Sequence, residues 1–203
     1  MIPTGVYSLI NDFLPMVILV TVVGFLVRLV LIVYAKQKVS VYQDFKLYLT
    51  ILYCFALFEL VTTTDFYSYT NNFIPFKEIL RYKSIMSPLF LRNVVGNIIL
   101  FVPFGFLISD FINSRAGKIN IFITSLLTLV TSTSIEVIQM YIGRSFDIDD
   151  IILNFIGSII GYIAFKLINK TFGKANEILK LIALILFFAV FIISLYIILV
   201  VFK

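Results

Sequence analysis

A glutamate near the end of a long apolar stretch is the most informative residue of this chain. Residues 119–142 contain Glu136 as their only charged side chain, with Gln139 one helical turn further on. Placing a carboxylate at the centre of a membrane helix costs roughly 2.5–3.5 kcal/mol on insertion scales, so such a group normally faces a polar interior. Glu136 could act as a base, bind a cation, pair with Arg144 or Arg92, or be protonated and structural. We favour a functional role.

The residues that follow add one cation and three carboxylates. The segment 144–150 contains Arg144, Asp147, Asp149 and Asp150. Aspartate at a helix N-terminus accepts hydrogen bonds from unpaired backbone N–H groups and complements the helix dipole. Helix capping explains one of the three aspartates well, but it explains all three less well. Arginine is suited to holding a phosphate or a carboxylate, and all-oxygen ligands suit magnesium or calcium.

Other apolar stretches are expected to bring further polar side chains to the same place. Asn93 and Asn97 are four residues apart, so both amides point to one helical face. Asp150 and Asn154 have the same spacing, and Glu59 stands near the end of an earlier apolar stretch. Neither catalytic residues nor metal ligands can be assigned from these spacings. We predict one polar site that contains Glu59, Arg92, Asn93, Asn97, Glu136, Gln139, Arg144, Asp147, Asp150 and Asn154.

Composition indicates which elements position these residues. Of the 203 residues, 61% are hydrophobic and 13% are charged, and the mean hydropathy is +1.09. A helix needs about 17–25 apolar residues to cross a hydrocarbon core of about 30 Å. The sequence therefore predicts an all-α integral membrane protein, a bundle of about six transmembrane helices near residues 14–35, 46–63, 94–112, 119–142, 151–168 and 181–202.

Small residues predict how some of these helices pack. Gly157 and Gly161 form a Gly-x-x-x-Gly surface, which allows close approach of a neighbouring helix. Ser125, Thr128 and Ser132 continue the face of Glu136 and are predicted to bridge neighbouring helices. With no histidine and one cysteine, the chain lacks the commonest metal ligand and cannot form an intramolecular disulfide.

Positive charges predict the orientation, because cytoplasmic flanks are enriched in lysine and arginine. Ten of them flank one side of the predicted helices and six the other, which places both termini outside the cytoplasm and the polar site at the outer face. The outer segment 71–81 could be an interfacial amphipathic helix, a tether or a lid over a ligand. The formal charge of +5 is spread among short loops, which argues against a nucleic-acid partner.

The ordered series of motifs resembles the VanZ-like family. The motifs are Asn93 to Gly105, Glu136-x-x-Gln139, Arg144, Asp147-x-x-Asp150, and Asn154-x-x-Gly157-x-x-x-Gly161. The resemblance divides the chain into an N-terminal helix and cytoplasmic loop (1–44), a VanZ-like core (45–168) and a C-terminal helix (169–203). It implies a multi-pass protein of a Gram-positive bacterial membrane whose founding relatives give low-level resistance to teicoplanin and related lipoglycopeptides.

Three functions follow as hypotheses. In the leading one, the outward site engages a lipoglycopeptide or a lipid-linked cell-wall precursor, with membrane lipid around it and no cofactor beyond a possible divalent cation. In the second, carboxylates such as Glu136 catalyse the modification of an envelope precursor, although the chain shows no nucleophile motif. In the third, Glu59 and Glu136 carry an ion or solute, although both stand away from the midplane where transport sites usually lie.

Overall fold

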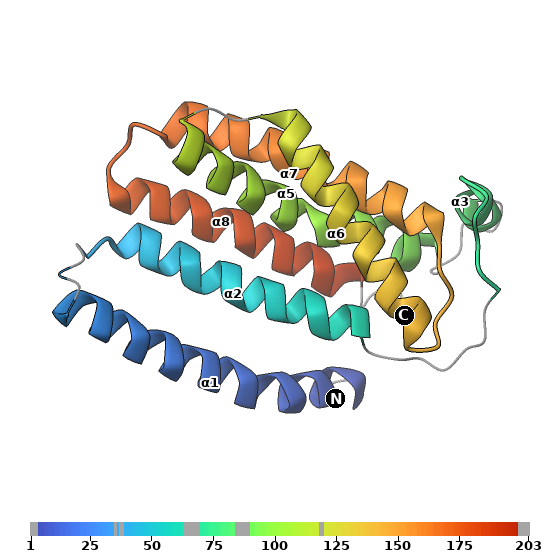
Figure 1. The fold of residues 1–203 in the computed structure, drawn as a ribbon, viewed down its shortest axis with the longest axis horizontal. Helices are drawn as coiled ribbons and strands as arrows, with labels where there is room; N and C mark the ends of the chain where they lie inside the picture. The colour runs from blue at the N-terminus through green and yellow to red at the C-terminus, as the bar shows by residue number, and fades with distance from the viewer. Residues whose placement is uncertain are drawn as a thin grey trace. The chain divides into compact units, whose positions relative to one another are not determined.

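The chain is an all-α membrane helical bundle, as the sequence predicts. The computed structural model describes residues 4–34, 36, 39–62, 70–83, 90–117 and 120–198. Over these residues no β-strand forms, and the one isolated bridge joins Asn72 and Asp147. The elements, labelled in Figure 1, are α1 (Thr4–Val33), α2 (Val41–Thr62), α3 (Lys77–Lys83), the π-helix η1 (Leu91–Val95), α5 (Gly96–Ala116), α6 (Ile121–Tyr141), α7 (Ile148–Phe172) and α8 (Glu177–Tyr196).

The chain forms two compact units, and the division falls inside α2. The first unit is Met1–Ala56 and the second is Leu57–Lys203. In the first unit, side chains join α1 to α2. The hydroxyls of Thr21 and Tyr48 are 2.7 Å apart, and Arg28 Nε lies 2.9 Å from an oxygen of Asp44. The candidate site lies in the second unit.

Short polar side chains cap the N-termini of three long helices of the second unit. Asn120 accepts hydrogen bonds from the first backbone N–H groups of α6, Asp147 does so for α7, and Asn176 for α8. These side chains satisfy donors that have no partner inside the helix. The α5 helix ends at Gly117, whose φ of 69° is the left-handed conformation common after a helix. The helix boundaries therefore follow from local sequence.

Glycines bring α5 and α7 into direct backbone contact. A Cβ atom on Gly105 of α5 would overlap the backbone of Ser158. In the same way, a Cβ on Gly157 would overlap Ile98 and one on Gly161 would overlap Val102. The predicted Gly-x-x-x-Gly surface of α7 thus packs on α5, within the second unit (Figure 1).

Four of the described helices are long and apolar enough to cross a membrane: Asn93–Ala116, Ile121–Tyr141, Ile148–Phe172 and Glu177–Tyr196. They correspond to the last four of the six predicted spans. Val17–Val33 is a shorter apolar helix in the position of the first. The predicted second span, 46–63, falls almost entirely within α2. The count of six and the location of the termini remain predictions.

The α6 helix turns polar side chains inward and apolar ones outward. Its buried residues are Thr124, Thr128, Ser132, Glu136 and Gln139, all of them polar. The prediction of this stripe was wrong at one end, because it contains Thr124 and not Ser125. Four-residue steps back from Glu136 through Ser132 and Thr128 reach position 124, so Ser125 turns aside and is only half-buried.

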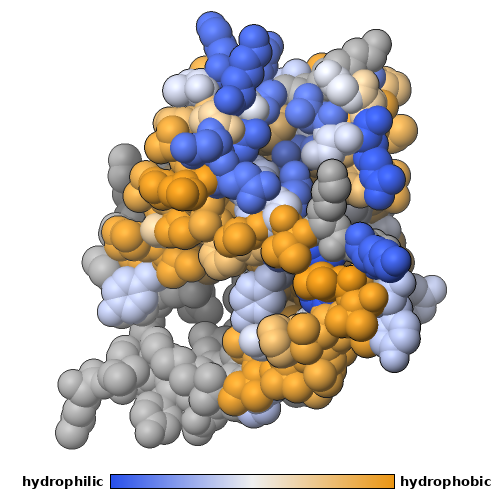
Figure 2. All heavy atoms as spheres, turned by 90° about the vertical axis from the view of Figure 1, so that its left-hand side faces the viewer, coloured by the Kyte–Doolittle hydropathy of each residue, from blue (hydrophilic) through white to orange (hydrophobic). Residues whose placement is uncertain are grey.

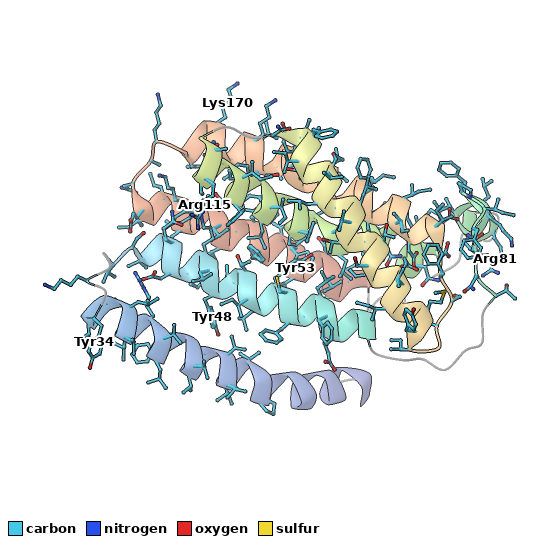
Figure 3. The ribbon with its side chains drawn as sticks, in the orientation of Figure 1. Tyr34, Tyr48, Tyr53, Arg81, Arg115 and Lys170 are labelled. Carbon is cyan, nitrogen blue, oxygen red and sulfur yellow. The ribbon has the colours of Figure 1, made fainter. Side chains whose placement is uncertain are left out.

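Basic side chains lie at both ends of the second unit, and α3 is at one of these ends. Arg115 and Lys170 are at the end where α7 leads into α8, whereas Arg81 of α3 is at the other end (Figure 3). Viewed from the first of these ends, hydrophilic side chains gather over the upper part of the molecule (Figure 2). Lys166 and Lys170, near the end of α7, and Lys174, just after it, are all exposed. This separation agrees with the grouping of charges used to predict orientation.

Replacing Gly161 by alanine should destabilise the bundle. The added methyl group meets the α5 backbone, so the two helices must separate at a cost of about 1–3 kcal/mol. The melting temperature of the detergent-purified protein should fall by about 2–4 °C per kcal/mol. Gly24→Ala is the matched control, because nothing lies within 4 Å of its Cβ position. Equal melting temperatures for both variants would contradict close packing of α5 on α7.

Candidate functional site

The site is built at the turn between α6 and α7, beginning with Glu136. This carboxylate is buried, with 1% of its surface exposed. One of its oxygens, Oε2, accepts a hydrogen bond of 2.8 Å from the backbone N–H of Asp147. The helix that carries Glu136 and the residue that starts the next helix are thereby joined directly.

Gln139 connects Glu136 to Arg144. Oriented to satisfy both neighbours, its amide nitrogen donates to Glu136 Oε1 at 3.0 Å, and its oxygen accepts from Arg144 Nη1 at 3.1 Å. The backbone supports this arrangement, because the N–H of Arg144 donates to the carbonyl of Gln139 at 2.9 Å. Glu136, Gln139 and Arg144, which form the sequence motif, are therefore linked by a chain of hydrogen bonds that we call the relay.

Asp147 caps α7 and also holds a distant segment. Its Oδ1 accepts from the N–H of Asp149 at 2.9 Å and from the amide of Asn72 at 2.9 Å. Removal from water raises the pKa of Asp147 above its ordinary 3.8, and these two hydrogen bonds oppose part of that rise. The carboxylate is thus a structural junction as well as a charge in the site.

Residues 71–81, which we call the α3 segment, are attached to this turn by their backbone. Asn72 donates its N–H to the carbonyl of Phe146 at 2.8 Å and accepts from the N–H of Ile148 at 3.0 Å. The side chain of Asn71 accepts from the N–H of Phe146 at 2.9 Å. The rings of Phe73 and Phe146 stack with centroids 5.1 Å apart.

Asp149 caps the first turn of α3 from a different helix. Its carboxylate accepts from the backbone N–H groups of Phe76 (2.5 Å), Glu78 (2.8 Å) and Ile79 (3.2 Å). The residue before α3 is Phe76, which has no side-chain acceptor and has a φ of 66°. An aromatic residue with left-handed backbone is uncommon, and strain of this kind persists only where the surroundings enforce it. Asp149 supplies both the missing cap and that restraint.

Asp150 and Asn154 extend the polar contacts from α7 to α5 and α6. Asn97 of α5 donates its amide to Asp150 Oδ1 at 2.5 Å. Asn154 donates to the hydroxyl of Ser132 on α6 at 2.9 Å. Asp150 also lies within electrostatic range of Glu136, Asp147 and Arg144. The site therefore joins residues from α5, α6 and α7.

Hydroxyl pairs continue from the site into the bundle. Thr128 of α6 and Ser158 of α7 have their hydroxyl oxygens 2.6 Å apart. Ser109 of α5 and Thr124 of α6 are 3.4 Å apart. All four side chains are buried. Each hydroxyl therefore provides a hydrogen-bonding partner for another in a place that water does not reach. These pairs bridge helices, as predicted for Thr128, and Ser132 does so through its contact with Asn154.

The structure brings together seven of the ten predicted residues through the contacts above: Asn97, Glu136, Gln139, Arg144, Asp147, Asp150 and Asn154. Glu59 is half-buried near the end of α2, and none of those contacts includes it. Asn93 is half-buried in η1. Since η1 is a π-helix, the α-helical spacing expected for Asn93 and Asn97 does not apply there. The Arg92 side chain lies outside the described residues.

Sequence reasoning did not place Asn72 or the capping role of Asp149 in the site. Asn72 is separated from Asp147 by 75 positions, so no local pattern connects them. Asp149 caps a helix that begins after Phe76, a residue that cannot cap it. One distant acceptor was therefore needed.

The completed site has more carboxylates than cations. Arg144 lies within electrostatic range of Glu136 and Asp150, and Arg81 lies within that of Asp147. Asp149 is compensated by the N-terminus of α3. Among the described residues, no group of three or more histidine, cysteine or acidic side chains is arranged to hold a metal ion. The arrangement presents an arginine fork beside carboxylate and amide acceptors, which suits a ligand that has both hydroxyl or amine donors and an anionic group.

A family model described as VanZ/LLP1 matches residues 45–169, a range that contains every residue of this site. No curated protein and no solved structure matches the chain.

Replacing Asp149 by asparagine should loosen the start of α3. The variant keeps an acceptor oxygen but loses the charge that strengthens three backbone hydrogen bonds. Amide hydrogen exchange at Phe76, Glu78 and Ile79 should become about tenfold faster, which corresponds to about 1.4 kcal/mol. Asp150→Asn is the control, because Asp150 accepts from Asn97 and not from α3. Unchanged exchange in Asp149→Asn would contradict the capping role.

Asp147 should give stability a measurable pH dependence. Because its pKa is raised on folding, the folded protein keeps this proton to higher pH than the unfolded chain. Its contribution to stability therefore falls as pH rises from 3.8 through the folded pKa, and is constant above it. Asp147→Asn retains the acceptor and removes the titration.

The measurement is the melting temperature of wild type minus that of Asp147→Asn, followed from pH 3.8 upward. This difference should decrease with pH and then level off. A difference that grows with pH would mean that the folded state stabilises the Asp147 carboxylate instead.

Proposed function

The chain belongs to the VanZ/LLP1 family, and we propose that it lowers the susceptibility of a Gram-positive bacterium to teicoplanin and related lipoglycopeptides. In this proposal the site at the α6–α7 turn faces outward and binds an envelope ligand, either the lipoglycopeptide or the lipid-linked cell-wall precursor to which such drugs are directed. Both termini would then lie outside the cytoplasm.

The observation that carries the proposal is the relay from Asp147 through Glu136 and Gln139 to Arg144. A buried carboxylate is expensive in a membrane protein unless it is hydrogen-bonded. Here Glu136 accepts from a backbone N–H and a side-chain amide, so it is fixed in position. The relay in turn fixes one side of the Arg144 guanidinium. Such preorganisation reduces the entropy lost when a ligand binds.

The chemistry of the site suits a sugar-peptide ligand. Arg144 can bind a carboxylate or phosphate with two parallel hydrogen bonds. Asp150 accepts from the Asn97 amide through Oδ1 and lies within electrostatic range of Arg144, so an acidic acceptor for a hydroxyl or amine of a ligand stands beside the guanidinium. A lipoglycopeptide combines such polar groups with an acyl tail, and a lipid-linked precursor combines them with a phosphate and a lipid.

Location supports the same conclusion. The site lies where α6 ends and α7 begins, at an end of two helices long and apolar enough to span a membrane. That end is opposite to the exposed Arg115 and Lys170 (Figure 3). Since basic flanks favour the cytoplasm, the site would open at the outer boundary of the bilayer. An amphiphilic envelope ligand is held at that depth.

The test is teicoplanin susceptibility of a sensitive Gram-positive host that expresses wild type, Arg144→Ala, Glu136→Gln or Arg115→Ala at matched membrane levels. Wild type and Arg115→Ala should raise the inhibitory concentration, because Arg115 is exposed at the opposite end of the bundle. Arg144→Ala and Glu136→Gln should remove most of the protection. Loss of a charged hydrogen bond costs about 1.5–3 kcal/mol, or at least about tenfold in binding.

Arg144→Ala and Arg115→Ala remove the same side chain from the two ends, so a general effect of losing a cation would appear in both. Equal protection by all four proteins would contradict a role for the site. No protection by a well-expressed wild type would contradict the proposed function itself.

A further inference from the structure

The α3 segment exposes large apolar side chains although its backbone is firmly attached. Phe73, Ile74, Phe76 and Leu80 have exposed fractions of 63%, 61%, 54% and 61%. The hydrogen bonds to Phe146, Asp147 and Asp149 hold the backbone of this segment. Four adjacent apolar side chains on a fixed backbone are costly in water and usually mark a contact surface.

We propose that the α3 segment is an interfacial anchor, whose apolar side chains enter the phospholipid layer at the boundary of the bilayer. This proposal rests on the geometry of the segment alone. It can therefore be true or false whether or not the protein confers the resistance proposed above. The partner is phospholipid, neither a second protein nor the bound ligand of the site.

The first argument for phospholipid is depth. The segment is hydrogen-bonded to residues 146–149, which are the junction where the membrane-spanning helix α7 begins. Its position along the membrane normal is therefore tied to the end of that span. Tyr141, the last residue of α6, is 83% exposed near the same junction. Aromatic side chains are common at this level of a membrane protein.

The second argument is continuity with surfaces that face lipid. On α6, Ile138 and Met140 are exposed, and on α7, Ile156 and Ile160 are exposed. These helices are long and apolar enough to span the bilayer, so such side chains meet acyl chains. The apolar side chains of the α3 segment add to this surface at its edge.

The third argument is charge. Lys77 and Arg81 stand on α3 beside the apolar side chains, and both are exposed. Arg81 Nη2 lies 2.8 Å from Glu78 Oε2, on the same helix. Basic residues next to aromatic and aliphatic ones are typical of helices that lie in the headgroup region, where the cations meet lipid phosphates. A protein partner would give no reason for this combination at this depth.

The chain contains no tryptophan, so a single introduced tryptophan reports from one place. We would compare Phe73→Trp, Ile74→Trp and Leu80→Trp, each exposed in the structure, in vesicles of phosphatidylcholine and phosphatidylglycerol. Brominated phospholipids with bromine near the start or the end of the acyl chain measure the depth of each tryptophan. Ile160→Trp, on the lipid-facing surface in the middle of α7, is the control for deep insertion.

The anchor predicts blue-shifted emission for all three segment variants, quenched most by bromine near the start of the acyl chain and little by aqueous iodide. Ile160→Trp should be quenched most by bromine near the chain end. Strong iodide quenching of the segment variants would overturn the proposal, because it would mean that the segment faces water. Quenching by neither agent would overturn it as well, because protein would then cover the segment. Maximal quenching by deep bromine would also contradict it.

Three variants keep the test decisive if one of them fails to fold. Phe73→Trp retains an aromatic ring for the stack on Phe146. Ile74→Trp and Leu80→Trp change aliphatic side chains that are mostly exposed.

Discussion

One buried carboxylate, Asp149, determines how the polar end of this protein is assembled. It accepts three backbone N–H groups from α3 and has 1% of its surface exposed. Without it, the helix would begin at a phenylalanine that cannot cap it and whose backbone is left-handed. With it, the α3 segment is fixed to the start of α7. Asn72 then reaches Asp147, and Asp147 in turn gives its N–H to Glu136. The position of Glu136 thus depends on contacts with a segment more than fifty residues earlier.

This arrangement divides the acidic residues into two roles. Asp147 and Asp149 cap the N-termini of α7 and α3 by accepting from backbone N–H groups. Glu136 and Asp150 are the carboxylates that lie beside Arg144, at the junction of α5, α6 and α7. Sequence reasoning expected helix capping to account for one aspartate. The structure shows two caps, one of them for a helix that is remote in sequence.

Much of the fold followed from sequence because membranes impose simple rules. Apolar length predicted the four long spans. The spacing of Gly157 and Gly161 predicted a close helix contact, and the structure shows that the partner helix is α5. The inward polar face of α6 was predicted from Thr128, Ser132 and Glu136, with an error at Ser125. Inside a membrane bundle, polar side chains must find partners in neighbouring helices, so their periodicity marks the buried face.

The rest could not be predicted because it depends on partners that are distant in sequence. The bridge between Asn72 and Asp147 and the cap of α3 by Asp149 are tertiary contacts with no local pattern. The face expected to be shared by Asn93 and Asn97 assumes a regular α-helix between them. A π-turn precedes α5, and it changes the angular step between successive side chains. Spacing arguments assume regular helix, and this helix is irregular where it enters the site.

The most direct test of the account is binding to the purified protein in nanodiscs. Teicoplanin and a lipid-linked cell-wall precursor would be titrated separately into wild type, Arg144→Ala and Arg115→Ala. The account predicts saturable binding of at least one probe by wild type and Arg115→Ala, and a dissociation constant raised at least about tenfold in Arg144→Ala. Failure of both probes to bind, or equal affinity in all three proteins, would contradict the claim that this polar junction is a ligand site.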